Sequence, residues 1–249
     1  MLTDSKGEPA LQTAIAPLRE LAHHGELTLE LEGHRAESFR DCDFVVVSPG
    51  VPLSLEYFNE SRKAGVPILA EVELAFRHLK GKILAITGTN GKTTTTTLLG
   101  ELLVGAGLNG HVAGNIGTPL ISFADSSRPD DIYAVELSSF QLEAIQEFRP
   151  TVAAILNLTP NHLDRYAGFD SYVEAKRRIF MNQESTDFAV LNADHSSTAR
   201  MASAVKATPV LFSHRTAVAH GTLGRAPWSP RSPSPRSLRP HSGLSGARA

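Results

Sequence analysis

The stretch from Ile83 to Thr94, ILAITGTNGKTT, constrains this chain more than any other. An apolar strand runs into a glycine-rich turn, and the turn runs into a helix. The glycines let backbone N–H groups approach an anion, and the helix presents the positive end of its dipole. Lys92 adds a point charge, and Thr93 adds a hydroxyl for Mg²⁺. The stretch therefore predicts a phosphate-binding loop for a nucleoside triphosphate.

The spacing of this loop is G-x-x-G-K-T rather than the commoner G-x-x-x-x-G-K-[ST], because position 86 is Ile. A tight strand-to-helix turn without a ligand is the alternative, but a lysine and two threonines directly after the second glycine disfavour it. The residues expected to bind ATP are Gly88, Thr89, Asn90, Gly91, Lys92, Thr93 and Thr94.

The composition is typical of a globular protein, with 41% apolar and 20% charged residues among 249. A formal net charge of −2 gives no electrostatic reason to expect nucleic acid or membrane partners. No apolar run approaches the length that spans a bilayer. The single cysteine, Cys42, excludes an internal disulfide, and the amino terminus lacks a signal-peptide pattern. We expect a soluble, cytoplasmic monomer.

Between residues 81 and 213, β-branched runs alternate with helical patterns, which predicts a doubly wound, mostly parallel α/β sheet of the phosphate-loop ATPase type. The expected strands are 82–87, 132–137, 152–156, 188–191 and 209–212. The expected helices are 93–105, 139–148 and 171–182.

Residues 1–80 predict a smaller, Rossmann-like α/β domain. The expected strands are 27–31, 44–47 and 66–69, and the expected helices are 11–23, 55–64 and 71–79. The chain begins on what looks like the end of a strand, so we expect this domain to be incomplete.

From about Arg215 onward, Lys, Asp and Glu are absent, and Ser, Pro, Gly and Arg dominate. Such a segment cannot build a core. It is either a flexible basic tail for an anionic surface or a non-native terminus from a shifted reading frame, and the abrupt change favours the second. We therefore treat 214–249 as a disordered or non-native tail outside the fold.

Polar residues follow two expected strands at the edge where open α/β sheets bind ligands. Glu136 follows one strand, and its carboxylate suits Mg²⁺. His162 lies in the segment after the next strand. A lone Glu or His is more often structural, and only the nearby phosphate loop favours ligand roles. Lys176 lies on a basic helix face, which alone gives it a weak claim to function.

The phosphate loop resembles that of Mur ligases and folylpolyglutamate synthases, which form amide bonds through acyl phosphates. Four further motifs occur in the order and spacing of MurD-type ligases: Gly114-Asn-Ile-Gly117, Glu136-Leu-Ser-Ser-Phe-Gln-Leu142, Asn161-His-Leu-Asp-Arg-Tyr166 and Tyr172-Val-Glu-Ala-Lys176. The run from Ser48 to Pro52, SPGVP, is similar to the uridine-nucleotide domain of that family. The resemblance covers about residues 1–213. It implies ATP-driven ligation of D-glutamate to UDP-N-acetylmuramoyl-L-alanine in peptidoglycan synthesis.

The resemblance also implies roles for single residues. Lys92, His162 and Lys176 are the catalytic residues it implies. Thr93 and Glu136 are implied to bind one Mg²⁺, and His162 and a carbamate on Lys176 are implied to bind a second. The residues implied to face the muramoyl-alanine part are Asn115, Ser138, Gln141 and His162. Those implied to bind the uridine nucleotide are Asp4, Ser5, Lys6, Ser48, Pro49 and Gly50.

The chain departs from the family in two respects. Pro160 and Asn161 stand where many members carry acidic residues, which lowers the charge beside the second metal. No counterpart of the third domain, which binds D-glutamate, follows Ser213, so we expect that this chain alone cannot complete ligation. A folylpolyglutamate synthase-like ligase and a non-catalytic nucleotide-binding fragment stay open as alternatives. The loop spacing disfavours a generic kinase or GTPase.

Overall fold

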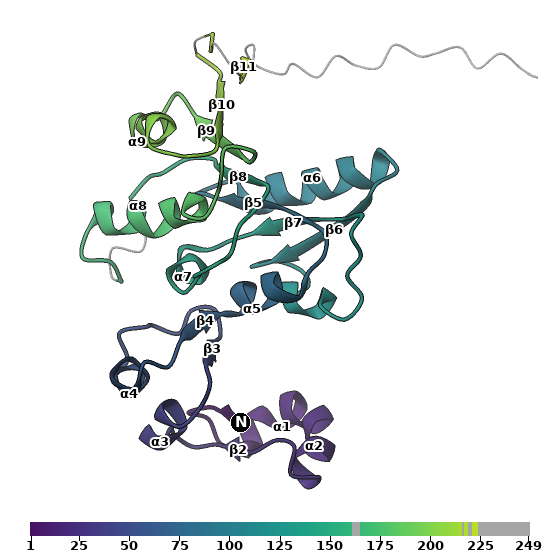
Figure 1. Cartoon of the computed structure of the whole chain (residues 1–249), viewed down its shortest axis with the longest axis vertical. Helices are drawn as coiled ribbons and strands as arrows, with labels where there is room; N and C mark the ends of the chain where they lie inside the picture. The colour runs from purple at the N-terminus through teal and green to yellow at the C-terminus, as the bar shows by residue number, and fades with distance from the viewer. Residues whose placement is uncertain (161–164, 216, 219–220, 224–249) are drawn as a thin grey trace, which may run out of the picture.

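The computed structural model describes residues 1–160, 165–215, 217–218 and 221–223. Residues 161–164, which include the predicted metal ligand His162, lie outside the described part. A large parallel sheet with helices on both faces makes up the carboxyl-terminal two thirds of that part, and a smaller α/β unit precedes it (Figure 1).

Seven strands of the described residues form one parallel sheet in the order β11-β10-β9-β8-β5-β7-β6. Their bounds are β5 Lys82–Thr87, β6 Asn109–Gly114, β7 Asp131–Glu136, β8 Val152–Ile155, β9 Phe188–Asn192, β10 Thr208–Ser213 and β11 Gly221–Leu223. The predicted doubly wound α/β fold is confirmed. Because β5 lies between β7 and β8, the phosphate loop that follows it has a strand end on either side.

Helix α6 covers one face of the sheet, and α5 lies against the other (Figure 1). Helix α6 approaches β6 so closely that a Cβ on Gly100 would lie 2.2 Å from Val112 Cγ2. The helices of this part are α5 Glu71–His78, α6 Lys92–Gly105, α7 Ser139–Glu143, α8 Phe169–Arg177 and α9 Ser196–Ala199, with single 3₁₀ turns at Leu120–Phe123, Arg178–Phe180 and Arg200–Ser203.

The amino-terminal unit contains two separate two-stranded parallel sheets, β1-β2 and β3-β4. Its strands are β1 Leu2–Thr3, β2 Leu29–Glu30, β3 Val45–Val47 and β4 Ile68–Ala70. Its helices are α1 Glu8–Ile15, α2 Arg19–His23, α3 Ala36–Arg40 and α4 Tyr57–Ala64, with a 3₁₀ turn at Ala16–Leu18. The predicted strands and helices of this unit are found with shifted ends, while α3 was not predicted.

Helix α5 packs into the core of the large sheet, although the predicted domain boundary at residue 80 assigns it to the amino-terminal unit. Val72 and Ala75 are fully buried in that core. The Glu73 carboxylate, also fully buried, accepts the backbone N–H groups of residues 146–148 at 2.8–3.1 Å. The prediction of a helix over 139–148 was too long, because α7 ends at Glu143 and these N–H groups bond to Glu73 instead.

Two strands were not predicted. Strand β6 has the sequence NGHVAG, which lacks the apolar run expected of a buried strand. It lies at the edge of the sheet and pairs with β7 over its whole length. Strand β11 falls inside the predicted tail, where Gly221–Leu223 pair in register with Leu211–Ser213. Residues 221–223 therefore pair with the sheet, although the predicted tail begins at residue 214.

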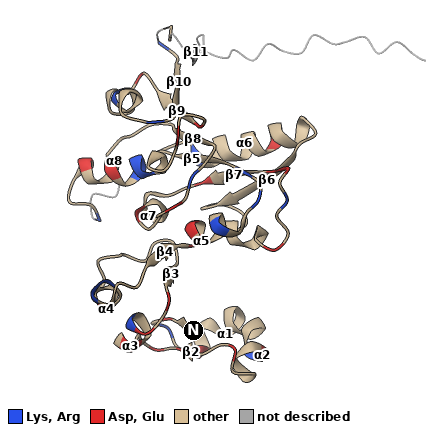
Figure 2. Cartoon of the chain, in the orientation of Figure 1, with Lys and Arg blue, Asp and Glu red and all other residues tan. Residues whose placement is uncertain are grey.

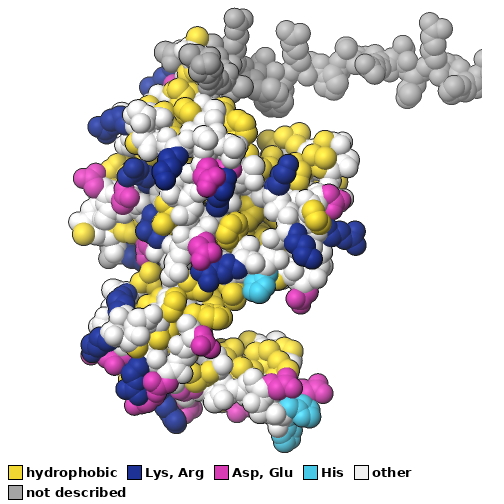
Figure 3. All heavy atoms as spheres, viewed as in Figure 1, with side chains coloured by type: hydrophobic (Ala, Val, Ile, Leu, Met, Phe, Trp, Pro, Cys, Tyr) yellow, Lys and Arg dark blue, Asp and Glu magenta, His cyan; other side chains and the backbone are white. Residues whose placement is uncertain are grey.

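Lysine and arginine residues are interspersed with aspartate and glutamate residues along both parts of the chain (Figure 2). The space-filling view shows the same mixture on one face, with hydrophobic side chains between the charges (Figure 3). None of the helices described is long and apolar enough to cross a bilayer.

Candidate functional site

The phosphate loop turns between β5 and α6 through two glycines with positive φ, Gly88 at 152° and Gly91 at 79°. A Cβ on Gly88 would lie 3.2 Å from Leu156 Cβ and 3.3 Å from the Asn157 carbonyl oxygen. Glycine is therefore required there by conformation and by the close approach of the neighbouring strand end. Lys92, the first residue of α6, donates from Nζ to the Thr89 carbonyl at 3.1 Å and so lies back over the loop.

Asn157, two residues after the end of β8, holds the phosphate loop through three hydrogen bonds. Its side-chain Oδ1 accepts the Asn90 N–H at 2.8 Å, and its Nδ2 donates to the Asn90 carbonyl at 2.9 Å. Its backbone carbonyl accepts the Thr89 N–H at 2.9 Å. Asn157 was not predicted as a site residue, although a polar residue after a buried strand is a usable signal.

Glu136 lies at the carboxyl end of β7 and is 2% exposed. It accepts hydrogen bonds from Thr93 Oγ1 at 2.8 Å and from Asn115 Nδ2 at 2.9 Å. The structure thus brings together three predicted site residues from three different segments. A carboxylate and a hydroxyl side by side are hard oxygen donors, which fit Mg²⁺ held together with phosphate and water. The described residues contain no group of three or more His, Cys, Asp or Glu that could hold a metal without such help.

Lys176 is 2% exposed, so the predicted basic outer face of its helix is not found; the exposed charged residues of α8 are Asp170, Glu174 and Arg177. Its Nζ donates to Thr87 Oγ1 at 3.1 Å, and the Thr87 hydroxyl donates to the Leu137 carbonyl at 2.8 Å. Burial lowers the pKa of Lys176 to about 7; repulsion by Lys92 adds to this effect, and attraction to Glu136 opposes it. A substantial fraction of the amine is therefore uncharged and nucleophilic near neutral pH.

Tyr172, one turn before Lys176, connects α8 to the phosphate loop. Its hydroxyl lies 3.1 Å from Thr89 Oγ1, and the same Thr89 atom contacts the backbone of Thr159. The Lys176 Nζ lies 5.0 Å from the centre of the Tyr172 ring. Tyr172 was predicted only as part of a motif, and its contact with the phosphate loop was not predicted.

Ser138 and Gln141 form a capping box at the start of α7. Gln141 Oε1 accepts the Ser138 backbone N–H at 3.0 Å, and Ser138 Oγ accepts the Gln141 N–H at 3.2 Å. Within the described part of the chain, Gln141 Nε2 is buried without a hydrogen-bond partner. A buried amide donor without a partner is costly, and Gln141 Nε2 therefore keeps the capacity to donate one further hydrogen bond.

The predicted uridine-binding residues lie around a cavity of about 560 Å³ in the amino-terminal unit. Five of the six predicted residues line it, namely Asp4, Ser5, Ser48, Pro49 and Gly50. Lys6 is not among the lining residues. An aromatic wall was not predicted: the rings of Phe39 and Tyr57 stack at 5.9 Å, and His34 lies edge-on to Tyr57 at 4.8 Å.

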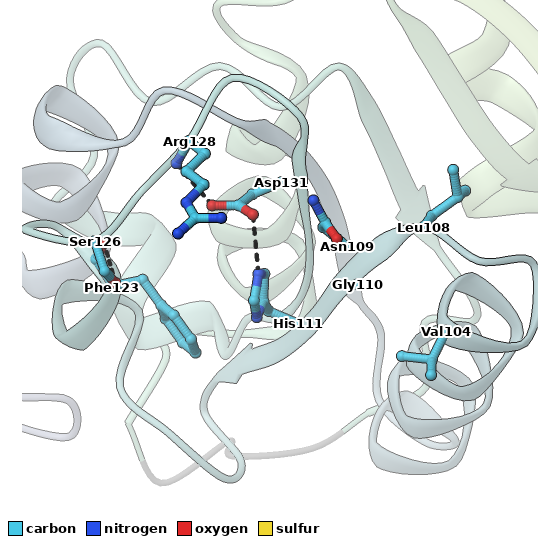
Figure 4. Close-up of a pocket in the computed structure, with 9 residues that line it drawn as sticks. All are labelled: Val104, Leu108, Asn109, Gly110, His111, Phe123, Ser126, Arg128 and Asp131. Carbon is cyan, nitrogen blue, oxygen red and sulfur yellow. Dashed lines mark hydrogen bonds and ion pairs between the residues drawn. The ribbon is translucent and has the colours of Figure 1, made fainter.

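A second cavity, of about 430 Å³, lies at the amino-terminal ends of β6 and β7, whereas the phosphate loop lies at the carboxyl ends of the strands (Figure 4). It is lined by the first residues of β6 and β7, Asn109 and Asp131, where His111 Nε2 lies 3.2 Å from Asp131 Oδ1. The Arg128 backbone N–H and His111 lower the pKa of the Asp131 carboxyl. Ligands of open α/β sheets bind at the carboxyl ends of the strands, so we do not include this cavity in the candidate site.

Comparison with known proteins identifies the family of this chain. The Mur ligase middle domain model matches residues 86–222. UDP-N-acetylmuramoylalanine--D-glutamate ligases of Koribacter versatilis and Geobacter metallireducens are 46% and 48% identical over 90% of this chain. The chain spans about half the length, 49%, of these two relatives.

Among solved structures, a UDP-N-acetylmuramate:L-alanyl-gamma-D-glutamyl-meso-diaminopimelate ligase from Neisseria meningitides superposes with a TM-score of 0.53 at 19% identity. The match covers 84% of this chain and 68% of that one, which supports the fold. Because the family model covers more than half of the chain and includes the phosphate loop, Glu136 and Lys176, this protein belongs to the Mur ligase family.

Proposed function

We propose that this chain carries the ATP site and the uridine-nucleotide site of a UDP-N-acetylmuramoylalanine--D-glutamate ligase. The supporting observation is the convergence of Lys92, Thr93, Glu136 and Lys176 at the carboxyl ends of β5 and β7, in a chain 46–48% identical to two such ligases.

The proposed reaction has two steps. A carboxylate oxygen of the alanyl group attacks the γ-phosphorus of ATP, which forms an acyl phosphate and releases ADP. The amine of D-glutamate then attacks the acyl carbon, loses a proton, and displaces phosphate to leave an amide. Phosphorylation is needed because an oxide ion is a poor leaving group.

The residues of this chain supply positioning and charge. Lys92 binds and neutralises phosphate oxygens during transfer. Thr93 and Glu136 would hold one Mg²⁺ together with ATP, which would offset negative charge on the phosphates. Asn115 keeps the Glu136 carboxylate in place, and the Gln141 amide donates to the muramoyl-alanine part.

The largely uncharged amine of Lys176 is suited to react with CO₂. The amine nitrogen bonds to the carbon of CO₂ and loses a proton, which gives a carbamate with two oxygen atoms. Such a group turns a buried lysine into a hard ligand for a second Mg²⁺. The partner proposed for it, His162, lies outside the described residues.

The binding test uses the whole chain and isothermal titration calorimetry with Mg²⁺ and a non-hydrolysable ATP analogue. Lys92→Ala should weaken binding roughly 10- to 150-fold, because a charge-assisted hydrogen bond contributes about 1.5–3 kcal/mol. Lys63→Ala, on the exposed surface of α4, is the matched control and should change nothing. Equal affinity in the wild type and Lys92→Ala would refute the ATP site.

A second titration, with UDP-N-acetylmuramoyl-L-alanine and with a folate, addresses the substrate. Selective binding of the folate would favour the folylpolyglutamate synthase alternative. We further propose that ligation needs the part of the relatives that this chain does not cover. ATP-dependent incorporation of radiolabelled D-glutamate by this chain, lost in Lys92→Ala, would refute that proposal.

A further inference from the structure

Arg165 joins the two ligand sites. Its Nη1 donates to the Gly50 carbonyl at 2.8 Å, and its Nη2 donates to the Val51 carbonyl at 3.3 Å. Both carbonyls belong to the loop that lines the cavity of the amino-terminal unit. The loop can present two successive carbonyls because Gly50 has a φ of 90°. The planar, forked guanidinium suits this double acceptor, which the point charge of a lysine cannot match.

The other contacts of Arg165 lie on α7, which follows Glu136 in the chain. The guanidinium carbon lies 3.7 Å from the centre of the Phe140 ring. Its Nη2 lies 3.7 Å from Glu143 Oε2. The side chain is 17% exposed, so these contacts are largely shielded from water. Arg165 thus connects the loop before α4 to the helix that begins at the edge of the ATP site.

From α7 the contacts continue to the phosphate loop. The Tyr166 hydroxyl donates to Glu143, and the Tyr166 ring meets the Tyr172 ring edge-on at 5.5 Å. The Tyr172 hydroxyl lies 3.1 Å from Thr89 Oγ1 in the phosphate loop. A continuous series of contacts therefore connects Gly50 with Thr89 through Arg165, α7, Tyr166 and Tyr172.

We propose that Arg165 is a positioning residue that links uridine-nucleotide binding to ATP binding. A ligand that fixes the Gly50–Val51 loop also fixes Arg165, α7 and, through Tyr172, the phosphate loop. The second ligand then meets loops that are already ordered, so each ligand strengthens the binding of the other. This inference rests on the proposed function, because it needs both sites to bind their ligands.

The test measures the affinity of the whole chain for UDP-N-acetylmuramoyl-L-alanine and for a Mg²⁺-bound, non-hydrolysable ATP analogue. Each affinity is measured alone and with the other ligand at saturation. We expect about tenfold tighter binding in the presence of the other ligand, by the same factor in both directions. Arg165→Ala should reduce this factor below two, and Arg165→Lys should reduce it less.

Two further variants distinguish a specific loss of coupling between the two ligands from a general loss of structure. Tyr172→Phe removes the contact with Thr89 without touching Arg165, and it should also lower the coupling factor. Arg177→Ala, with its exposed partner Glu174 on the same helix as Tyr172, should leave the factor unchanged. If Arg165→Ala does not fold, Tyr172→Phe and Arg165→Lys decide the question.

The outcomes distinguish this inference from the proposed function. A wild-type chain that binds neither ligand refutes the proposed function, and the inference falls with it. A chain that binds both ligands without coupling, or with coupling unchanged in Arg165→Ala and Tyr172→Phe, leaves the proposed function standing and overturns the role of Arg165.

Discussion

The two proposed ligand sites of this chain are built in different ways. The proposed ATP site lies on a seven-stranded sheet, and its polar groups are fixed by neighbouring strand ends: Asn157 holds the phosphate loop, and Thr93 and Asn115 hold Glu136. The cavity proposed to bind uridine lies among strands of two or three residues in two-stranded sheets. Such small sheets are marginal by themselves, so this cavity depends on aromatic packing and on Arg165.

The proposed phosphoryl transfer would need polar groups that are fixed before the substrate arrives, and the broad parallel sheet supplies them. The small sheets of the amino-terminal unit give their cavity a less rigid support. Four predictions test this difference.

Glu73→Ala should have the largest effect. Its carboxylate is fully buried and accepts the N–H groups of residues 146–148 and a bond from Arg77. Removing it leaves buried donors without an acceptor, which costs about 4 kcal/mol in the free energy of unfolding. Urea denaturation measures the loss. Glu60→Ala, which removes the surface pair with Lys63, is the control and should cost less than about 0.5 kcal/mol. Similar losses from both would contradict the contrast between the two parts.

Hydrogen exchange compares the two parts directly. Amides of β5 and β7, inside the large sheet, should exchange about a hundredfold more slowly than amides of β3 and β4. This ratio corresponds to about 2.7 kcal/mol between local opening of the small sheets and opening of the large one. Mass spectrometry of peptides from the labelled chain, with intrinsic exchange rates removed, gives the ratio. Equal protection would mean that both parts open as one cooperative unit, and it would contradict the expected difference in local stability.

Lys176 should make the stability of the large sheet depend on pH. The folded chain releases the Lys176 proton near pH 7, whereas an unfolded lysine releases it near 10.4. Between these values the unfolded state binds more protons, so stability rises with pH through this window and is lower below it. The rise is at most about 1.4 kcal/mol per pH unit.

The measurement compares wild type with Lys176→Met in urea at pH 7.5 and 8.5, without Mg²⁺ or nucleotide and in CO₂-depleted buffer. The wild type should gain about 1 kcal/mol more than the variant over this unit. The same slope in both proteins would show that Lys176 is charged in the folded chain.

The sequence predicted most of the large sheet because its buried strands are apolar runs. It also predicted the phosphate loop, because the glycines, Lys92 and Thr93 at this spacing indicate phosphate binding by themselves. Glu136 and the phosphate loop were placed together because parallel strands end at one edge. The sequence could not predict that Glu73 ends α7, because that depends on a contact 73 residues or more away in the chain. Arg165 and Tyr172 were missed for the same reason. Their partners come from distant segments, and neither residue type alone indicates a link between sites.

The smallest expected effect compares two glycines with open space around them. Gly65 ends α4 at a φ of 73°, and a Cβ there would contact nothing within 4 Å. Gly65→Ala should cost about 0.5–1 kcal/mol, because a left-handed alanine costs about 1–2 kcal/mol and the stiffer unfolded chain offsets part of that. Gly105→Ala, in the last turn of α6, meets the same open space without a positive φ and should stabilise the protein instead. Thermal unfolding of both variants tests the sign, and equal signs would show that the positive φ of Gly65 does not disfavour a side chain there.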